Sequence, residues 1–207
     1  MGLDMYLNRT KRIKGVTVEQ MMIIDAYLNW RDDETARKYT LEEWCGVDDE
    51  KLPPKELIEY YEESCKNSKS EDVGYWRKAN QIHNWFVCNV QDGEDDCGCY
   101  EVGKEQLEDL LERCKIVKSN SKLVSGKIQN GYTWVDGHKE VIYADGSYIE
   151  NPEIAMEYLP TQGGFFFGST DYDEYYLMDI DDTIQIIEKV LDETDFDTQV
   201  IYYSSSW

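Results

Sequence analysis

The sequence predicts an α+β fold in which an antiparallel or mixed sheet packs with about four to five helices. Residues 3–8 alternate apolar and polar side chains, the pattern of a half-buried strand. Longer segments farther along the chain repeat apolar residues every three or four positions, which indicates amphipathic helices. Hydrophobic residues make up 41% of the 207-residue chain and aromatic residues 13%, so the composition provides a substantial core and argues against disorder.

After the strand at 3–8, the chain carries two helical segments. Residues 18–30 have roughly helical spacing. Thr17 is placed to cap this helix, because threonine accepts hydrogen bonds from the free N–H groups of a first turn. Residues 55–65 follow Pro53-Pro54 and also repeat apolar side chains at helical spacing. Proline suits the first turn of a helix, so we expect the second helix to begin there.

The strongest helical stripe covers residues 71–90, where apolar residues recur at i, i+3, i+4 and i+7. This stripe predicts one helix, which ends at Gln91-Asp92-Gly93. A short strand at 99–102 and a helix whose buried side spans 107–117 are expected to follow.

Residues 132–135 and 140–144 predict a β-hairpin, because the Asp136-Gly137 pair between them supplies the positive φ angles of a tight turn. The hairpin belongs to segment 119–150, which we expect to protrude as an insertion. At about 150 residues per domain, the length permits a single domain covering residues 1–207.

The last part of the chain predicts a strand, a helix and a second strand. Three consecutive phenylalanines between glycines at 164–168 are typical of a strand buried on both faces. Residues 179–191 have helical spacing, with acidic residues near the start, where the helix dipole favours them. Residues 198–203 predict the final strand, which we expect to join the sheet.

The charge is strongly acidic and unevenly distributed. The chain has 43 acidic and 21 basic side chains and a formal net charge of -22, which argues against direct binding to nucleic acid or to an anionic membrane. Residues 151–207 contain thirteen acids and one base, Lys189, whereas 113–135 contain five bases and no acid. We expect the basic segment to neutralise an acidic surface elsewhere in the fold.

No segment resembles a targeting signal or a membrane span. The acidic residue Asp4 lies among the first residues, which contain no apolar run of the length that a signal peptide needs. No apolar stretch approaches the ~20 residues that cross a bilayer. We therefore expect a cytoplasmic protein with no membrane partner. In that compartment the six cysteines are expected to be free thiols rather than three disulfides.

Four blocks, at 1–7, 75–86, 95–97 and 159–168, together with the Tyr-Ser-Ser-Ser-Trp tail at 203–207, carry a resemblance. The chain resembles a family of uncharacterised proteins from bacteriophages and prophages that begin with GLDMYL and end in an aromatic-Ser-Ser-Trp tail. The resemblance implies a phage accessory protein in a bacterial cytoplasm, with interference in host defence or host metabolism as its role. It transfers no catalytic residues.

The best candidate site is the block 75–89, which combines aromatic, basic and amide side chains. If these residues lie on one helix, the Trp76 indole would stack on a planar ring, and Arg77 and Lys78 would meet phosphate. Asn80 and His83 would form hydrogen bonds with the edges of the ring or the ribose. The predicted ligand-binding residues are Trp76, Arg77, Lys78, Asn80, His83 and Gln162. In the alternative interpretation, Trp76 and His83 belong to the core and the cations form ordinary surface ion pairs.

Other chemistry has weaker support. Asp95-Asp96-Cys97-Gly98-Cys99 offers carboxylates and thiols, but a single Cys-x-Cys with only two histidines in the chain predicts no metal site. A cysteine nucleophile with His83 as its base has no recognisable motif. Thr161-Gln162-Gly163-Gly164 matches no known phosphate loop and is more typical of a turn. We therefore predict no catalytic residue and no cofactor.

Three functional hypotheses follow. The first is a phage accessory protein that binds a small, nucleotide-like phosphorylated ligand to counter host defence. The second is an acidic interaction protein whose surface, mostly from 171–197, imitates nucleic acid and inhibits a host enzyme with a basic groove. The third is a hydrolase that uses the first site. The partner is thus a small phosphorylated molecule or a host defence protein, and the exposed hairpin and tail are suitable contacts for a homo-oligomer.

Overall fold

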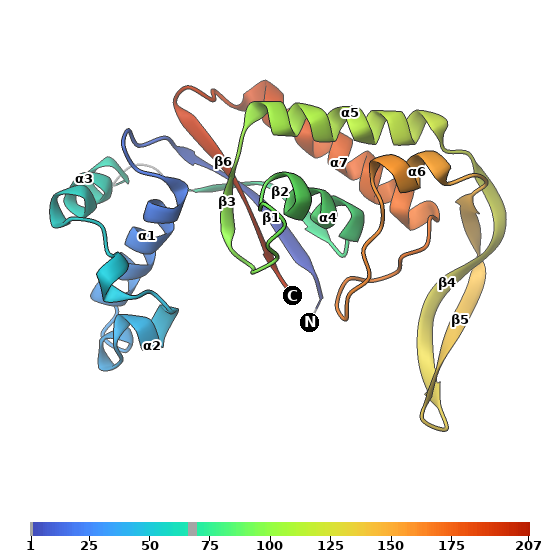
Figure 1. Cartoon of the computed structure of the whole chain (residues 1–207), viewed down its shortest axis with the longest axis horizontal. Coiled ribbons are helices and arrows are strands. Elements are labelled where there is room, and N and C mark those ends of the chain that lie inside the picture. Colours follow the sequence, from blue (N-terminus) through green and yellow to red (C-terminus); the bar gives the residue numbers. More distant parts are fainter. Residues whose placement is uncertain (1, 66–69) are drawn as a thin grey trace.

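The computed structural model describes residues 2–65 and 70–207, without the side chain of Lys139, and has the predicted α+β fold. Its main sheet is antiparallel throughout, with strand order β2-β1-β6-β3 (Figure 1). In that order the strands are Glu71–Arg77, Asp4–Lys11, Gln199–Ser206 and Cys99–Val102. The strands predicted at 3–8, 99–102 and 198–203 are therefore confirmed, and the first and last of them pair at the centre of the sheet.

Helices pack against both faces of this sheet. The larger layer contains α4 (Asn80–Asn89), α5 (Lys104–Asn120), α6 (Glu153–Tyr158) and α7 (Glu174–Glu193). The smaller layer contains α1 (Val18–Asp32) and α3 (Lys55–Cys65). The short helices η1 (Ala36–Lys38), α2 (Leu41–Cys45) and η2 (Asp49–Lys51) connect α1 to α3. The one- to two-turn helices α2 and α6 were not predicted from the sequence.

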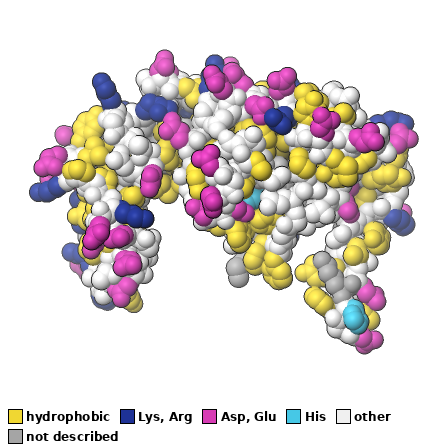
Figure 2. Space-filling model, viewed as in Figure 1, with side chains coloured by type: hydrophobic (Ala, Val, Ile, Leu, Met, Phe, Trp, Pro, Cys, Tyr) yellow, Lys and Arg dark blue, Asp and Glu magenta, His cyan; other side chains and the backbone are white. Residues whose placement is uncertain are grey.

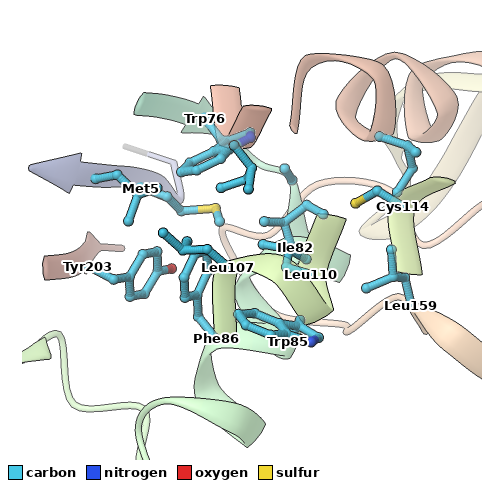
Figure 3. Packing of buried hydrophobic residues seen from close by; sticks show 14 of the residues in the cluster. Met5, Trp76, Ile82, Trp85, Phe86, Leu107, Leu110, Cys114, Leu159 and Tyr203 are labelled. Carbon is cyan, nitrogen blue, oxygen red and sulfur yellow. The ribbon is translucent and has the colours of Figure 1, made fainter. Parts of the chain in front are cut away.

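The alternation of β6 divides the apolar residues between the two layers. Ile201 and Tyr203 belong to the larger core, whereas Val200 packs in the smaller one. In the larger core the rings of Phe86 and Tyr203 stack with centroids 3.9 Å apart and planes 8° from parallel (Figure 3). Aromatic contacts of this kind add about 0.5–1.5 kcal/mol beyond the burial of their area.

The helices with clear local signals form where they were expected. Thr17 caps α1, with its Oγ1 accepting from the Gln20 amide at 3.1 Å, while the Thr17 amide donates to Gln20 Oε1 at 3.0 Å. The helices predicted at 55–65 and 107–117 correspond to α3 and α5.

The single helix predicted at 71–90 is wrong. Its first part is β2, which pairs with β1 from Asp4↔Arg77 to Arg9↔Glu71, and only its second part is helical, as α4. Pairing with a distant strand overrides the helical stripe, a common outcome for segments rich in aromatic residues. Gly74 lets β2 pack closely on α7, because a Cβ there would lie 2.7 Å from Ile186 Cγ2.

The strand predicted at 164–168 is also wrong, because this segment is an irregular loop. Its backbone makes one hydrogen bond to the sheet region, in which the Leu3 amide donates to the Phe166 carbonyl at 3.1 Å. Phe167 is buried, whereas Phe165 is 93% exposed. The aromatic run is therefore not buried on both faces, as the prediction required.

The helix predicted at 179–191 is confirmed but begins earlier, at Glu174. Asp173 caps it, and its Oδ1 accepts from the amides of Tyr175 and Tyr176 at 2.9 and 3.1 Å. Asp179 therefore lies in the second turn of α7 rather than at its start.

The predicted hairpin is present and longer than expected. β4 (Leu123–Val135) and β5 (His138–Ile149) form a separate antiparallel pair, which extends away from the main sheet in Figure 1. Asp136 and Gly137 have φ angles of 49° and 80°, as the tight turn requires. Ile128 and Ile149 are buried near the base of the hairpin, whereas Trp134 near its tip is 65% exposed.

Two further features are the state of the cysteines and the apolar character of the helices. All six cysteines are free thiols, as expected. Across the two described ranges, no helix is both long and apolar enough to cross a membrane.

Candidate functional site

A pocket of about 360 Å³ opens between the turn that joins β2 to α4, the loop before α7, and the first turns of α7. We call it the Asp179 pocket. Basic and acidic side chains line it together, namely Arg77, Lys78, Asp171, Asp173, Asp179 and Asp182. Its volume lies within the range of sites for small ligands, near the lower end.

Arg77 and Lys78 bring two cations to one side of the pocket. Both side chains approach Gly2, where a Cβ would lie 3.3 Å from Lys78 Cε and 3.6 Å from Arg77 Nε. Arg77 Nε lies 3.9 Å from Asp4 Oδ1, a long and exposed ion pair. Lys78 forms no ion pair with any side chain in the described ranges. The two cations are therefore close together and weakly engaged by protein carboxylates.

The backbone at Lys78 explains this arrangement. Lys78 has a φ of 63°, a left-handed conformation that is uncommon outside glycine. Its amide donates to the Leu3 carbonyl at 2.8 Å, and its own carbonyl accepts from the Asn80 amide at 2.8 Å. Gly168 lies against this turn, because a Cβ there would be 3.2 Å from Lys78 Cβ. The sharp turn ends β2 and begins α4 within three residues.

Asn80 holds the loop before α7 in place. Its Nδ2 donates to the carbonyls of Phe167 and Ser169 at 3.0 and 2.7 Å, and its Oδ1 accepts from the Gln162 amide at 2.9 Å. Only 2% of Asn80 is exposed. Asn80 thus shapes the pocket wall, and Gln162, which was also predicted as a site residue, contacts Asn80 through its backbone.

Asp179 also lines the pocket and was not singled out from the sequence as a site residue. Its Oδ2 accepts from Gln81 Nε2 at 3.1 Å, and Gln81 is 2% exposed. Burial, together with the nearby charges of Asp182 and Asp173, raises the pKa of Asp179 to about 6, although the Gln81 hydrogen bond acts to lower it. Asp179 is therefore an oriented carboxylate that titrates near neutral pH.

Asp173 contributes a second buried carboxylate. Because its Oδ1 caps α7, only Oδ2 remains, and this atom has no hydrogen-bond partner among the described residues. Burial raises the pKa of Asp173, since an ionised carboxylate is costly to remove from water.

Trp76 and His83 lie in the core rather than in the pocket. Trp76 Nε1 donates to Thr183 Oγ1 at 2.9 Å. His83 is fully buried, with Nδ1 hydrogen-bonded to the Tyr203 hydroxyl at 2.7 Å and Nε2 to Asp95 Oδ2 at 3.1 Å. The other Asp95 oxygen accepts from Trp207 Nε1 at 3.1 Å. The indole and imidazole thus have protein partners, as in the packing alternative.

The structure offers little support for metal or thiol chemistry. In the described part of the chain, no group of three His, Cys, Asp or Glu side chains is arranged to hold a metal ion. Burial raises the pKa of Cys99 to about 12, which opposes formation of a thiolate. Asp96 instead stabilises a turn, with its Oδ1 accepting from the Gly98 amide at 2.7 Å.

The basic segment at 113–135 neutralises part of the acidic surface, as expected. Lys115 Nζ lies 2.6 Å from Glu188 Oε1, and Lys118 Nζ lies 2.6 Å from Asp181 Oδ1, so α5 supplies cations to α7. Acidic and basic side chains are accordingly interspersed over the face in Figure 2.

No protein-family model, curated protein or solved structure matches the chain, so the Asp179 pocket is interpreted from its own geometry.

Proposed function

We propose that the protein binds a small phosphorylated molecule of the nucleotide class in the Asp179 pocket. The observation that carries this proposal is the convergence of Arg77 and Lys78 on one side of a pocket of about 360 Å³. Arg77 makes only the long contact to Asp4, and Lys78 forms no ion pair with a side chain among the described residues, so both cations can meet a ligand. Two adjacent cations suit a phosphate group, because guanidinium and ammonium groups donate charge-assisted hydrogen bonds to its oxygens.

The backbone of Lys78 supports the same proposal. A left-handed lysine costs about 1–2 kcal/mol relative to ordinary backbone, and strain of this kind is concentrated at functional sites. In the setting implied by the phage resemblance, the protein would sequester a nucleotide that the host uses in defence or metabolism.

The acidic-mimic hypothesis has less support, because Lys115 and Lys118 pair with acids of α7. These pairs interrupt the continuous negative surface that imitation of nucleic acid requires. The hydrolase hypothesis would use Asp179 as its base, but nothing in the described pocket identifies a nucleophile.

The test is calorimetric titration of the protein with nucleoside 5′-monophosphates and with the corresponding nucleosides. Each monophosphate is expected to bind at least tenfold more tightly than its nucleoside. The double variant Arg77→Ala/Lys78→Ala is expected to weaken monophosphate binding by about tenfold or more, since a charge-assisted hydrogen bond contributes ~1.5–3 kcal/mol.

The chain offers a matched control in Arg37 and Lys38, another adjacent and exposed Arg-Lys pair, which lies on η1 and outside the pocket. The variant Arg37→Ala/Lys38→Ala removes the same net charge and is expected to bind like the wild type. Equal weakening in both double variants would mean that only the overall charge matters, and the site assignment would then be wrong.

A further inference from the structure

We infer that the α7 wall of the Asp179 pocket selects a guanine nucleotide, with Asp179 as the acceptor for the base. This inference rests on the proposed function and deepens it, because it names the ligand class and the residue that discriminates between bases. It depends on which hydrogen-bonding groups of the wall are still available to a ligand.

The wall is rich in acceptors, and several of its donors are already engaged. Both hydrogens of the Asn80 amide go to backbone carbonyls, one Gln81 Nε2 hydrogen goes to Asp179, and Thr161 Oγ1 donates to the Thr170 carbonyl at 3.0 Å. The hydroxyl groups of Ser169 and Tyr175 have no acceptor among the described residues. The acidic lining, in contrast, consists of acceptors. A ligand group that contacts these carboxylates must therefore bring N–H donors, since an acceptor there would meet carboxylate oxygens without a hydrogen.

Asp179 is suited to receive such donors. An ionised carboxylate has about four acceptor positions, and the single side-chain bond from Gln81 occupies one of them. Gln81 is almost fully buried, so this bond fixes the direction of the carboxylate before a ligand binds. Asp179 is only partly exposed, and the low local dielectric strengthens a hydrogen bond formed there.

Asp173 gives an independent indication that acceptors are in excess on this wall. The residue is 3% exposed, lines the same pocket, and leaves Oδ2 without a partner among the described residues. Buried acceptors are normally satisfied, and an exception calls for an explanation. Because this oxygen is not accessible at the surface of the pocket, it marks a local excess of acceptors and is not itself a contact of the ligand.

Among the common bases, guanine best matches an acceptor wall. Its ring N–H and its amino group are adjacent and can donate in parallel to one carboxylate, whereas the amino groups of adenine and cytosine stand beside a ring nitrogen that is itself an acceptor. Uracil offers one ring N–H between two carbonyls. The phosphate would then meet Arg77 and Lys78, which line the same pocket.

The experiment compares guanosine, inosine and adenosine 5′-monophosphates by calorimetric titration at pH 7.5. Inosine differs from guanosine only in lacking the amino group, so we expect it to bind at least tenfold more weakly, and adenosine more weakly still. This comparison uses the wild-type protein and does not depend on any variant folding.

Asp179→Asn is expected to weaken binding of guanosine 5′-monophosphate at least tenfold and to reduce its advantage over inosine. The asparagine oxygen can still accept from Gln81, and circular dichroism checks that the variant is folded. Asp192→Asn makes the same charge change on an exposed residue of α7 outside the pocket and is expected to bind like the wild type.

The outcomes separate the two proposals. If all three monophosphates bind with similar affinity and Asp179→Asn has no effect, the guanine inference is overturned while the proposed phosphate site stands. If none of them binds, both are overturned.

Discussion

Asp179 is a carboxylate of the candidate site whose ionisation is coupled to folding. Its carboxylate lies in a partly buried pocket beside Asp173 and Asp182, so the ionised form is disfavoured in the folded protein. The folded-state pKa of about 6 exceeds the ordinary value of 3.8, and the folded protein therefore binds more protons than the unfolded chain between these values. Ionisation of Asp179 consequently destabilises the fold.

This difference predicts how stability depends on pH. The contribution of Asp179 is most favourable below pH 4, falls as the pH rises from about 4 to 6, and costs up to about 3 kcal/mol above pH 6. Asp179→Asn cannot ionise, so we expect it to unfold at higher urea than the wild type at pH 7.5, with a smaller difference at pH 4.5. Urea titrations at both pH values measure this, with Asp192→Asn as the control. A pH-independent difference would contradict the burial of the charge.

At the scale of elements, β2 and α7 are joined by one buried polar contact. Trp76 Nε1 donates to Thr183 Oγ1 at 2.9 Å, and Thr183 Oγ1 in turn donates to the Asp179 carbonyl at 2.6 Å. Thr183 is fully buried, so no water reaches this pair. The contact therefore fixes the strand that ends at Arg77 against the helix that carries Asp179.

Thr183→Val keeps the shape of the side chain but removes the acceptor for the Trp76 indole. We expect it to lower the free energy of unfolding by about 1–3 kcal/mol, because the buried N–H loses its partner. Thr183→Ser keeps the hydroxyl and loses one methyl group, so it should cost less. Urea unfolding of both variants makes the comparison, and a larger loss for serine would show that packing, rather than the hydrogen bond, joins the two elements.

Elements with a clear local pattern could be predicted from the sequence, whereas a boundary that distant contacts decide could not. Thr17 and the proline pair before α3 specify helix starts within a few residues. The division of 71–90 into β2 and α4 depends instead on pairing with β1 and on a left-handed Lys78, for which no glycine or proline gives a signal. The helical stripe continued through both parts and concealed the turn.

Only part of the candidate site could be predicted, because distant contacts bring some of its residues together. Arg77 and Lys78 are adjacent in the sequence, and the structure brings both to the pocket. Asp179 and its partner Gln81 are 98 positions apart, so only the tertiary fold, in which α4 and α7 share one core, brings them together. The acidic residues near the start of the predicted helix at 179–191 were the available signal, and they were interpreted as dipole partners.

At the scale of the whole molecule, the net charge of -22 cannot be neutralised internally. The chain has 21 basic side chains for 43 acids, so at least 22 carboxylates have no basic partner of their own. Pairs such as Lys115–Glu188 relieve repulsion locally between α5 and α7, but they are exposed and contribute little individually. Long-range repulsion among the remaining acids therefore opposes folding.

Salt distinguishes these two contributions. Sodium chloride weakens the exposed pairs and also screens the repulsion, since the Debye length falls from about 30 Å at 0.01 M to about 10 Å at 0.1 M. Because unpaired acids outnumber pairs, we expect the melting temperature at pH 7.5 to rise by roughly 2–6 °C between these concentrations, in proportion to a gain of one or two kcal/mol. Lys115→Gln/Lys118→Gln removes two cations and should show a larger rise. A melting temperature that falls with added salt would mean that ion pairs, rather than repulsion, dominate the surface electrostatics of this protein.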